Sequence, residues 1–323
     1  MSVIKAKKAS GLIFCSLFLI WVLGGCSATL EIDEIRQTQN IASFKPVKLD
    51  VPFFAQDEYQ CGPAALAMLL KWSAVDVSPE IIKPLVYVPE KQGSFPIEMV
   101  AAVRQFNRIP YVIEPSISAL LKELEAGNPV LVFQNLGLDW FPKWHFAVVV
   151  GVDVAANQVT LHSGTIEKHT MTLDKFEYTW RRAKKWAMVA MRAGQLPETA
   201  DSLKYIKAVS YFEKKGQLEL ARISYQAAID RWPDQLIALM GLANISYLSG
   251  SLEDAEYFYQ KAIGIQQTYA PAHNNLAMVL MEQGRLTRAQ EHARKAVELG
   301  GSHTKSYQET LTEINQQLGN SGQ

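Results

Sequence analysis

The strongest constraint on the fold is a repeat of 34 residues in the C-terminal part of this 323-residue chain. Gly216, Gly250 and Gly284 are separated by 34 residues (250 − 216 and 284 − 250). Three further sets of positions keep the same spacing: Leu218, Leu252 and Leu286; Ala221, Ala255 and Ala289; Ala228, Ala262 and Ala296. Glycine suits the turn between two helices, and alanine lets the two helices pack closely where they cross. The period therefore predicts a stack of helix pairs.

This pattern resembles the tetratricopeptide repeat over roughly residues 203–301. Tyr225 and Tyr259 occupy the large aromatic position between the alanines, and Ala293 replaces it in the third unit. Three repeats are about the minimum for a stable stack. A final group of apolar residues at helical spacing predicts a capping helix: Leu311, Ile314 and Leu318. We therefore expect an all-α solenoid of three repeats and a capping helix over residues 203–318.

The first 26 residues have the pattern of an export signal. A positive start is supplied by Lys5, Lys7 and Lys8. Residues 12–23 are apolar apart from Ser16, a run too short for a comfortable membrane span. The run ends in Leu-Gly-Gly-Cys at residues 23–26, which resembles the lipobox of bacterial lipoproteins. An ordinary secretory signal with a chance cysteine is the alternative.

The lipobox resemblance implies that the mature chain begins at Cys26, with acyl chains on its thiol and amino group. Several acyl chains hold a protein stably on a membrane where one does not. Ser27 follows the cysteine, which in Gram-negative bacteria favours sorting to the outer membrane. We therefore expect a lipid-anchored protein of the bacterial cell envelope, on the periplasmic face of the outer membrane. Residues 27–46 are polar without a sustained period and are predicted to be a tether.

The number of cysteines limits the kinds of site that the chain can form. Of the three cysteines, Cys15 leaves with the signal and Cys26 is acylated, so Cys61 is the one remaining thiol. An intramolecular disulfide is then impossible, and a structural zinc site, which is usually rich in thiolates, is not expected. We expect no metal and no cofactor. Lys+Arg and Asp+Glu both number 32, a balance that gives no support for nucleic-acid binding. Cys61 is therefore either a buried small residue or a nucleophile.

Between residues 47 and 192 the pattern predicts an α+β domain. Alanines and leucines predict a helix that begins at Cys61, with Pro63 in its first turn. Runs rich in β-branched residues predict strands at 130–135, 145–153, 159–162, 171–173 and 186–192. His145 therefore begins a strand. Residues 193–202 contain Gly, Pro and polar residues and are predicted to be a linker between the two domains.

Two segments of this domain carry a family resemblance. The sequence Q-D-E-Y-Q-C-G-P-A-A-L-A-M-L, from Gln56, and H-F-A-V-V-V-G-V-D, from His145, resemble the double-glycine, bacteriocin-leader-processing cysteine peptidases and their papain-like relatives. The resemblance spans residues 47–192. It implies a papain-like fold in which Cys61 is the nucleophile, His145 the general base and Gln56 the donor to the oxyanion. Gln60 is a weaker rival for the last role, because the family usually places its glutamine six residues before the cysteine and Gln56 lies five before (61 − 56).

The third catalytic member departs from the family pattern. The family has Asp on the strand after the histidine, whereas this chain reads V-T-L-H-S-G-T from Val159. His162 or Ser163 falls at the corresponding position, and a backbone carbonyl is a further substitute. Asp153 and Asp139 are remoter candidates. The group matters because it fixes the tautomer and orientation of the catalytic imidazole.

The sequence therefore predicts a lipid-anchored periplasmic cysteine peptidase that cleaves a peptide or isopeptide bond through a thioester. Its solenoid would recruit a protein substrate or partner, and Asn244, Asn274 and Asn275 either bind a peptide backbone in the groove or are solvated and capping residues. An amidase or acyltransferase on the same fold is one alternative. A non-catalytic scaffold of peptidase-like fold is another, favoured by the missing Asp.

Overall fold

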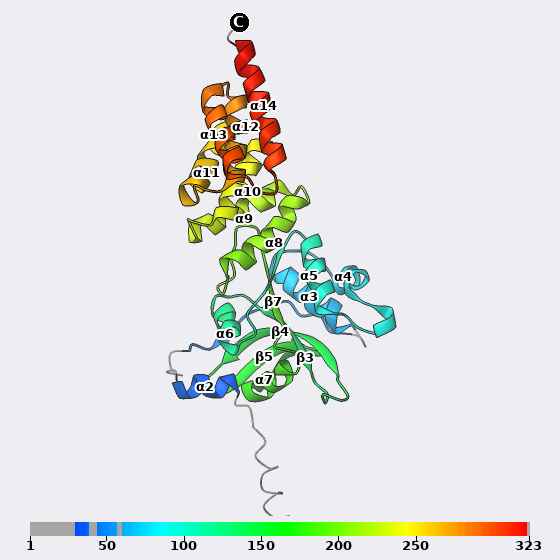
Figure 1. The fold of residues 1–323 in the computed structure, drawn as a ribbon. Helices are drawn as coiled ribbons and strands as arrows, with labels where there is room; N and C mark the ends of the chain where they lie inside the picture. The colour runs from blue at the N-terminus through cyan, green and yellow to red at the C-terminus, as the bar shows by residue number, and fades with distance from the viewer. Residues whose placement is uncertain (1–29, 39–43, 57–59, 322–323) are drawn as a thin grey trace, which may run out of the picture.

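The computed structural model describes residues 30–38, 44–56 and 60–321 (Figure 1). The predicted export signal and the lipobox with Cys26 lie outside the described residues. The N-terminal part has seven strands, β1 (Val47–Lys48), β2 (Ile109–Val112), β3 (Val130–Asn135), β4 (Trp144–Asp153), β5 (Gln158–Ser163), β6 (Ile166–Thr172) and β7 (Ala187–Met191). Its helices are α2 (Glu31–Thr38), α3 (Cys61–Trp72), α4 (Pro79–Val86), the short 3₁₀ helix η2 (Pro89–Lys91), α5 (Pro96–Gln105), α6 (Ile117–Glu125) and α7 (Leu173–Arg181).

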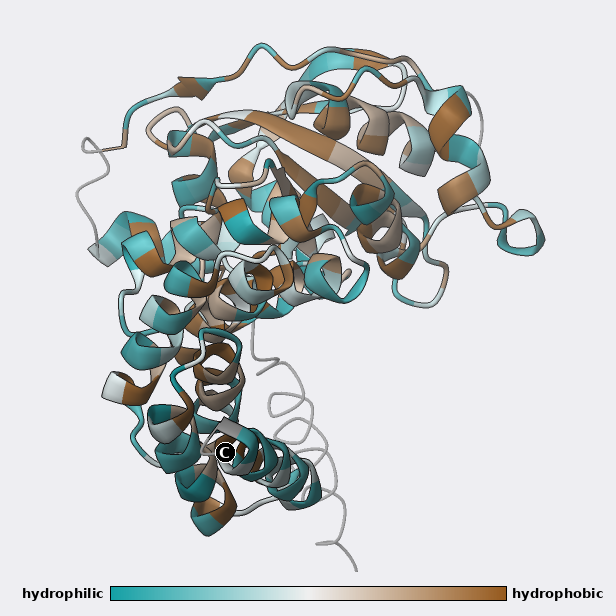
Figure 2. Cartoon of the chain, turned by 90° about the horizontal axis from the view of Figure 1, so that it is seen from above, coloured by the Kyte–Doolittle hydropathy of each residue, from teal (hydrophilic) through white to brown (hydrophobic). Residues whose placement is uncertain are grey.

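The strands form one antiparallel sheet in the order β2-β7-β3-β4-β5-β6, with β1 paired to β4. Side chains of a strand point alternately to its two faces. Along β4, Phe146 and Val148 pack in the core shared with α3, whereas Ala147 and Val149 pack in the core shared with α6 and α7. Both faces of β4 are therefore buried, which explains its continuous apolar run. Figure 2 shows apolar strands beside helices that carry both apolar and polar residues.

Helix α3 is buried along most of its length, from Gly62 to Leu70. A β-carbon at Gly62 would lie only 2.3 Å from Ser94 Oγ and 2.6 Å from Ser94 Cβ. The glycine after Cys61 is therefore required by the close approach of the loop that precedes α5. This contact fixes the first turn of α3, and with it the position of Cys61.

The prediction of a tether over residues 27–46 is wrong for residues 31–38, which form α2. Ile32 and Ile35 of this helix are buried in the core of the domain. The buried carboxylate of Glu177 accepts hydrogen bonds from the backbone N–H groups of Glu31 and Ile32, at 2.9 and 3.0 Å. Lys185 is paired with both Glu31 and Glu177. This segment is part of the folded domain because a distant carboxylate satisfies its first N–H groups.

The C-terminal part is the expected solenoid. Its helices are α8 (Ser202–Lys214), α9 (Leu218–Arg231), α10 (Leu236–Leu248), α11 (Leu252–Ile265), α12 (Ala270–Glu282), α13 (Leu286–Leu299) and α14 (Thr304–Ser321). Gly216, Gly250 and Gly284 lie at the turns within the pairs, with φ of 73°, 76° and 74°. Only glycine adopts this conformation without steric cost, which accounts for their spacing. The predicted fold class, an α+β domain followed by an all-α repeat solenoid, is confirmed.

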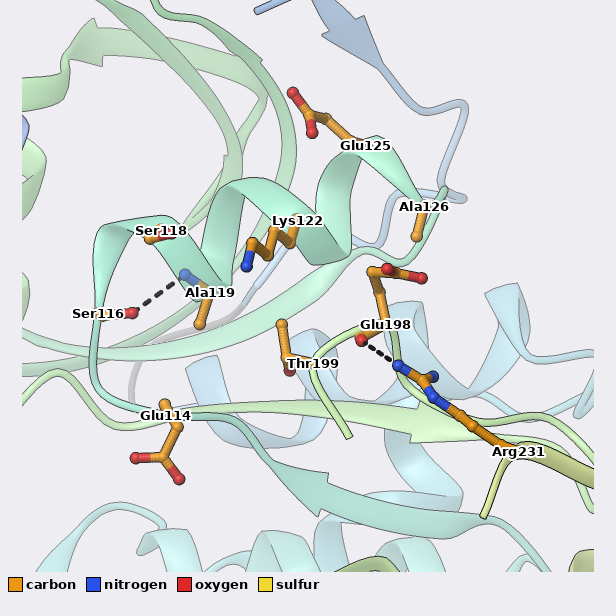
Figure 3. A pocket seen from close by; sticks show the side chains of 10 residues that line it. All are labelled: Glu114, Ser116, Ser118, Ala119, Lys122, Glu125, Ala126, Glu198, Thr199 and Arg231. Atoms are coloured by element: carbon orange, nitrogen blue, oxygen red, sulfur yellow. Dashed lines mark hydrogen bonds between the residues drawn. The ribbon is translucent and has the colours of Figure 1, made fainter. Parts of the chain in front are cut away.

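The segment predicted as a linker is held against the domain. The buried carboxylate of Glu123, on α6, accepts hydrogen bonds from Thr199 N at 2.8 Å and from Thr199 Oγ1 at 2.6 Å. One core continues from the sheet into the first repeat and includes Tyr111 and Tyr205. Figure 3 shows the polar pocket of about 720 Å³ at this junction, where Arg231 donates to the carbonyl oxygen of Glu198. The first repeat is therefore packed on the N-terminal domain.

Candidate active site

Cys61 is the first residue of α3 and is partly buried. Burial raises the pKa of its thiol, and nearby backbone N–H groups, first that of Phe146 and then those of Gly62 and Cys61 itself, oppose the rise. Phe146 follows His145 on β4, so the thiol lies beside the start of that strand. The first turn of α3 and the beginning of β4 are thus brought together although the two segments are distant in the chain.

His145 is the second residue of β4, directly after the loop that joins β3 and β4. Its Nε2 lies 2.9 Å from Ser163 Oγ at the end of β5. Burial, assisted by the positive charge of Lys143, lowers the pKa of His145 from 6.5 to about 4. The ring is therefore neutral near pH 7. When its Nε2–H donates to Ser163, Nδ1 is left as a proton acceptor.

Of the two candidates for the third member, Ser163 contacts His145 and His162 does not orient it. His162 is fully buried, and both of its ring nitrogens are used elsewhere. Its Nε2 lies 2.9 Å from the carbonyl oxygen of Val51, and its Nδ1 accepts the N–H of Lys168 at 3.2 Å. Adjacent residues of a strand face opposite sides, which separates the two side chains.

The remoter carboxylates do not orient His145 either. Asp153 is at the other end of β4, eight residues away (153 − 145), about 26 Å at the rise of an extended strand. Its Oδ1 accepts the N–H of Ala156 in the following turn. Asp139 is exposed in the loop between β3 and β4. Ser163 is thus the side chain that hydrogen-bonds His145 among the residues described here.

Gln56 lies beside the same cluster. Its backbone N–H donates to the carbonyl oxygen of Gly164 at 3.3 Å, which places it next to Ser163. Its Nε2 is buried and has no hydrogen-bond partner within the described part of the chain. A buried amide without a partner costs free energy, so it indicates a site where a ligand oxygen completes the hydrogen bond. Gln60, the rival candidate, is the N-cap residue of α3 and makes no side-chain cap.

Sequence reasoning missed one polar side chain close to the nucleophile. Ser94 is buried against Gly62, and its hydroxyl has no hydrogen-bond partner among the described residues. No signal in the sequence connects it with Cys61, because it lies in a loop that contains no motif. It forms part of the wall beside the first turn of α3.

The resting electrostatics differ from the expected ion pair. A helix N-terminus and a neighbouring imidazolium both lower the pKa of a thiol, so a nucleophilic Cys61 beside His145 would be expected to rest as an ion pair. Instead, burial raises the pKa of the thiol and lowers that of His145. No hydrogen bond joins Sγ to the imidazole among the described residues. Burial penalises both charged forms, so the resting pair is a neutral thiol and a neutral imidazole.

Comparisons with known proteins address both parts of the chain. Residues 48–188 match the model of the Peptidase_C39 like family, and residues 206–271 and 274–300 match two tetratricopeptide-repeat models. The chain carries a C39-like peptidase domain followed by tetratricopeptide repeats. The resemblances of the two parts of the chain to C39-type peptidases and to tetratricopeptide repeats are thereby confirmed. No curated protein sequence matches the chain.

Solved structures resemble each part separately. The C39-like domain is similar to a putative C39-like peptidase from Bacillus anthracis, with 18% identity, a TM-score of 0.40, and coverage of 46% of this chain and 98% of that one. The repeats are similar to the first tetratricopeptide domain of Spaghetti (RPAP3) bound to an HSP90 peptide, with 18% identity, a TM-score of 0.35, and coverage of 36% and 93%. They are also similar to the Yersinia enterocolitica type III secretion translocator chaperone SycD, with 16% identity, a TM-score of 0.34, and coverage of 36% and 83%.

No group of three or more His, Cys, Asp or Glu side chains in the described ranges is arranged to hold a metal ion. No helix within those same ranges is long and apolar enough to cross a membrane.

Proposed function

We propose that the C39-like domain is a cysteine peptidase in which Cys61 is the nucleophile and His145 the general base. The hydrogen bond between His145 Nε2 and Ser163 Oγ carries this proposal. It orients the ring from one nitrogen and leaves Nδ1 as the acceptor for the thiol proton. Ser163 thus takes the orienting place that an Asp has in related peptidases, without the negative charge that would stabilise an imidazolium.

Acylation would begin from the neutral pair. The Cys61 S–H proton passes to His145 Nδ1 as the sulfur attacks the peptide carbonyl carbon and a C–S bond forms. The oxyanion that develops is bound by Gln56 Nε2 and by a backbone N–H at the start of α3. The C–N bond then breaks, the imidazolium gives its proton to the leaving amine, and a thioester remains on Cys61.

Deacylation would use the same groups. His145, neutral again, takes a proton from water, which attacks the thioester carbonyl. The C–S bond breaks, the imidazolium returns its proton to the departing sulfur, the carboxylic acid product leaves and the Cys61 thiol is regenerated. An amidase or an acyltransferase would share the acylation step and differ in the bond cleaved or the acceptor used, so analysis of the products separates these activities.

We also propose the setting of this activity. The Leu-Gly-Gly-Cys pattern supports lipid attachment at Cys26, and Ser27 supports a place on the periplasmic face of the outer membrane. The repeats support recruitment of a protein substrate or partner. Because the first repeat is packed on the C39-like domain, a bound protein would be presented to Cys61 and His145 in one orientation.

The test is a search for the thioester. The chain from Ser27 to Gln323 would be incubated with a peptide library, and the protein and peptides would be analysed by mass spectrometry. The proposal expects cleaved peptides and an acyl adduct on Cys61, both lost in Cys61→Ala. With His145→Gln as a matched control, cleavage should fall by about 10²-fold or more. Cleavage that persists in Cys61→Ala would refute the assignment.

A non-catalytic scaffold is the second candidate. It is favoured by the raised pKa of the thiol and by the absence, within the described residues, of a hydrogen bond between Sγ and the imidazole. The scaffold predicts no acyl adduct with any peptide and unchanged partner binding in Cys61→Ala. The unpaired Nε2 of Gln56 opposes this candidate, because a scaffold has no oxyanion to bind.

A further inference from the structure

The loop between β3 and β4 presents large apolar side chains to solvent. Leu138, Trp140 and Phe141 are 52%, 81% and 73% exposed. The turn that carries them is ordered, because the backbones of Leu138 and Phe141 exchange two hydrogen bonds of 3.1 Å. At its base, Asn135 Oδ1 accepts the N–H groups of Gly137 and Lys143 at 2.9 and 2.8 Å. An ordered turn that holds aromatic rings in water indicates a contact surface.

Basic residues surround this loop. Lys143 is in the loop itself, and Arg182, just after α7, donates a hydrogen bond to the carbonyl oxygen of Gly137. Residues 175–185 contain five basic side chains, Lys175, Arg181, Arg182, Lys184 and Lys185. Their one acidic residue, Glu177, is buried and paired with Lys185. Asp139 in the loop offsets Lys143, and Lys185 is paired with Glu177 and Glu31. The local positive excess is therefore carried by Lys175, Arg181, Arg182 and Lys184.

The same region holds the start of the described chain. The segment 182–185 contacts the loop through Arg182 and the first residue of α2 through Lys185, whose Nζ lies 2.7 Å from Glu31 Oε2. Figure 1 shows α2 and the β3–β4 loop at the end of the molecule opposite the C-terminus. In the sequence, Cys26 lies four residues before Leu30 (30 − 26), so the proposed acyl attachment precedes α2 by a short stretch of chain.

We infer that the β3–β4 loop and the basic segment 175–185 form a membrane-contact surface for a bilayer that contains anionic phospholipid. Trp140 and Phe141 enter the boundary between headgroups and acyl chains, and the exposed Lys175 and Lys184 bind lipid phosphates. Tryptophan and basic residues are the side chains that proteins place at this boundary. The surface supplements the lipid attachment proposed above and holds the C39-like domain against the membrane, with the solenoid directed away from it.

A peptide substrate is the competing occupant, because the loop immediately precedes His145. Peptide sites are concave, whereas Trp140 and Phe141 project from the tip of a turn. A pocket of about 520 Å³ nearby is lined by Trp144 and Arg182 and includes neither tip residue. The tip therefore lies outside this concave surface, as contact with a bilayer requires.

Vesicle co-sedimentation tests the inference with the chain from Ser27 to Gln323, which keeps every described residue and lacks Cys26. Vesicles of phosphatidylcholine, with and without phosphatidylglycerol, are titrated against the chain. Trp140→Ser/Phe141→Ser should lower partitioning into the phosphatidylglycerol vesicles by about tenfold or more. The matched control is Leu203→Ser/Leu248→Ser, which removes two apolar residues of the solenoid that are 66% and 67% exposed and should leave partitioning unchanged.

A second measurement locates the contact. Brominated phosphatidylglycerol vesicles should quench the tryptophan fluorescence of the wild-type chain, and Trp140→Phe should remove most of that quenching. Far-UV circular dichroism of each variant confirms that the fold is retained. The inference is overturned if the wild-type chain does not bind phosphatidylglycerol vesicles, or if the double loop variant binds them equally well. It is also overturned if that variant binds normally but has a raised KM for a cleaved peptide, which would assign the loop to the substrate cleft.

These outcomes are independent of catalysis. Cys61→Ala should partition like the wild-type chain, because the thiol is partly buried at the start of α3 and takes no part in the contact. A chain that binds vesicles but cleaves no peptide would refute the proposed peptidase and leave the membrane surface standing.

Discussion

Burial of His145 makes the stability of the domain dependent on acid in a calculable way. Its pKa is about 4 in the folded chain, against an ordinary 6.5. Between these values the unfolded chain binds a proton that the folded chain does not, so stability falls as the pH is lowered from about 6.5 towards 4. The stability that depends on a neutral His145 is therefore fully present above pH 6.5 and is lost as the pH falls to about 4. The difference of 2.5 units (6.5 − 4) corresponds to about 3 kcal/mol.

The assay is urea unfolding of the chain from Ser27 to Gln323 at pH 7.5 and at pH 4.5, with His145→Gln as the comparison. Glutamine keeps an amide near Ser163 and does not titrate. The wild-type chain should lose about 2–3 kcal/mol more than the variant over this interval. Other titrating groups, including His292, whose pKa is also lowered by burial, are common to both chains and cancel. Equal losses in the two chains would refute the conclusion that His145 is held neutral.

Three further predictions concern residues around the site. Gly62→Ala should lower the free energy of unfolding in urea by about 1–3 kcal/mol, because the added Cβ overlaps Ser94. Adding Ser94→Gly should restore most of this loss, and an equal loss with Ser94 or Gly at position 94 would contradict the contact. Glu177→Ala should lower the free energy of unfolding by about 3 kcal/mol, since the first N–H groups of α2 and the ammonium group of Lys185 lose their buried partner. Limited proteolysis should then cleave α2, and unchanged resistance to the protease would argue against this role of Glu177. Gln56→Ala should lower kcat for a cleaved peptide by about 10²-fold with little change in KM, and a change in KM alone would exclude an oxyanion role.

Local patterns predicted much of the fold. The repeat could be predicted because the turn within each helix pair requires a glycine with positive φ at the same position, as at Gly216 and Gly250. The strand that begins near His145 could be predicted because both faces of β4 are buried, so its sequence is a continuous apolar run rich in valine. In both cases the residues that determine the local structure lie within a short stretch of sequence.

Features that depend on distant partners could not be predicted in this way. Helix α2 contains only two buried side chains, and its N–H groups are satisfied by Glu177, about 145 residues later. The choice between His162 and Ser163 depends on which face of β5 meets His145, and the pairing of β5 with β6 shifts register between Leu161 and Ser163. The neutral state of Cys61 and His145 results from burial by the whole domain, which no motif encodes.

In the proposed mechanism His145, oriented by Ser163, activates the thiol of Cys61. The most direct test is the rate at which a small thiol-directed electrophile alkylates Cys61 from pH 5 to pH 10. With His145 as the base, the wild-type rate should show a plateau at neutral pH, below the raised pKa of the thiol, and the plateau should disappear in His145→Gln and weaken in Ser163→Ala. Identical profiles in the wild-type chain and His145→Gln, each following thiol ionisation alone, would contradict the account.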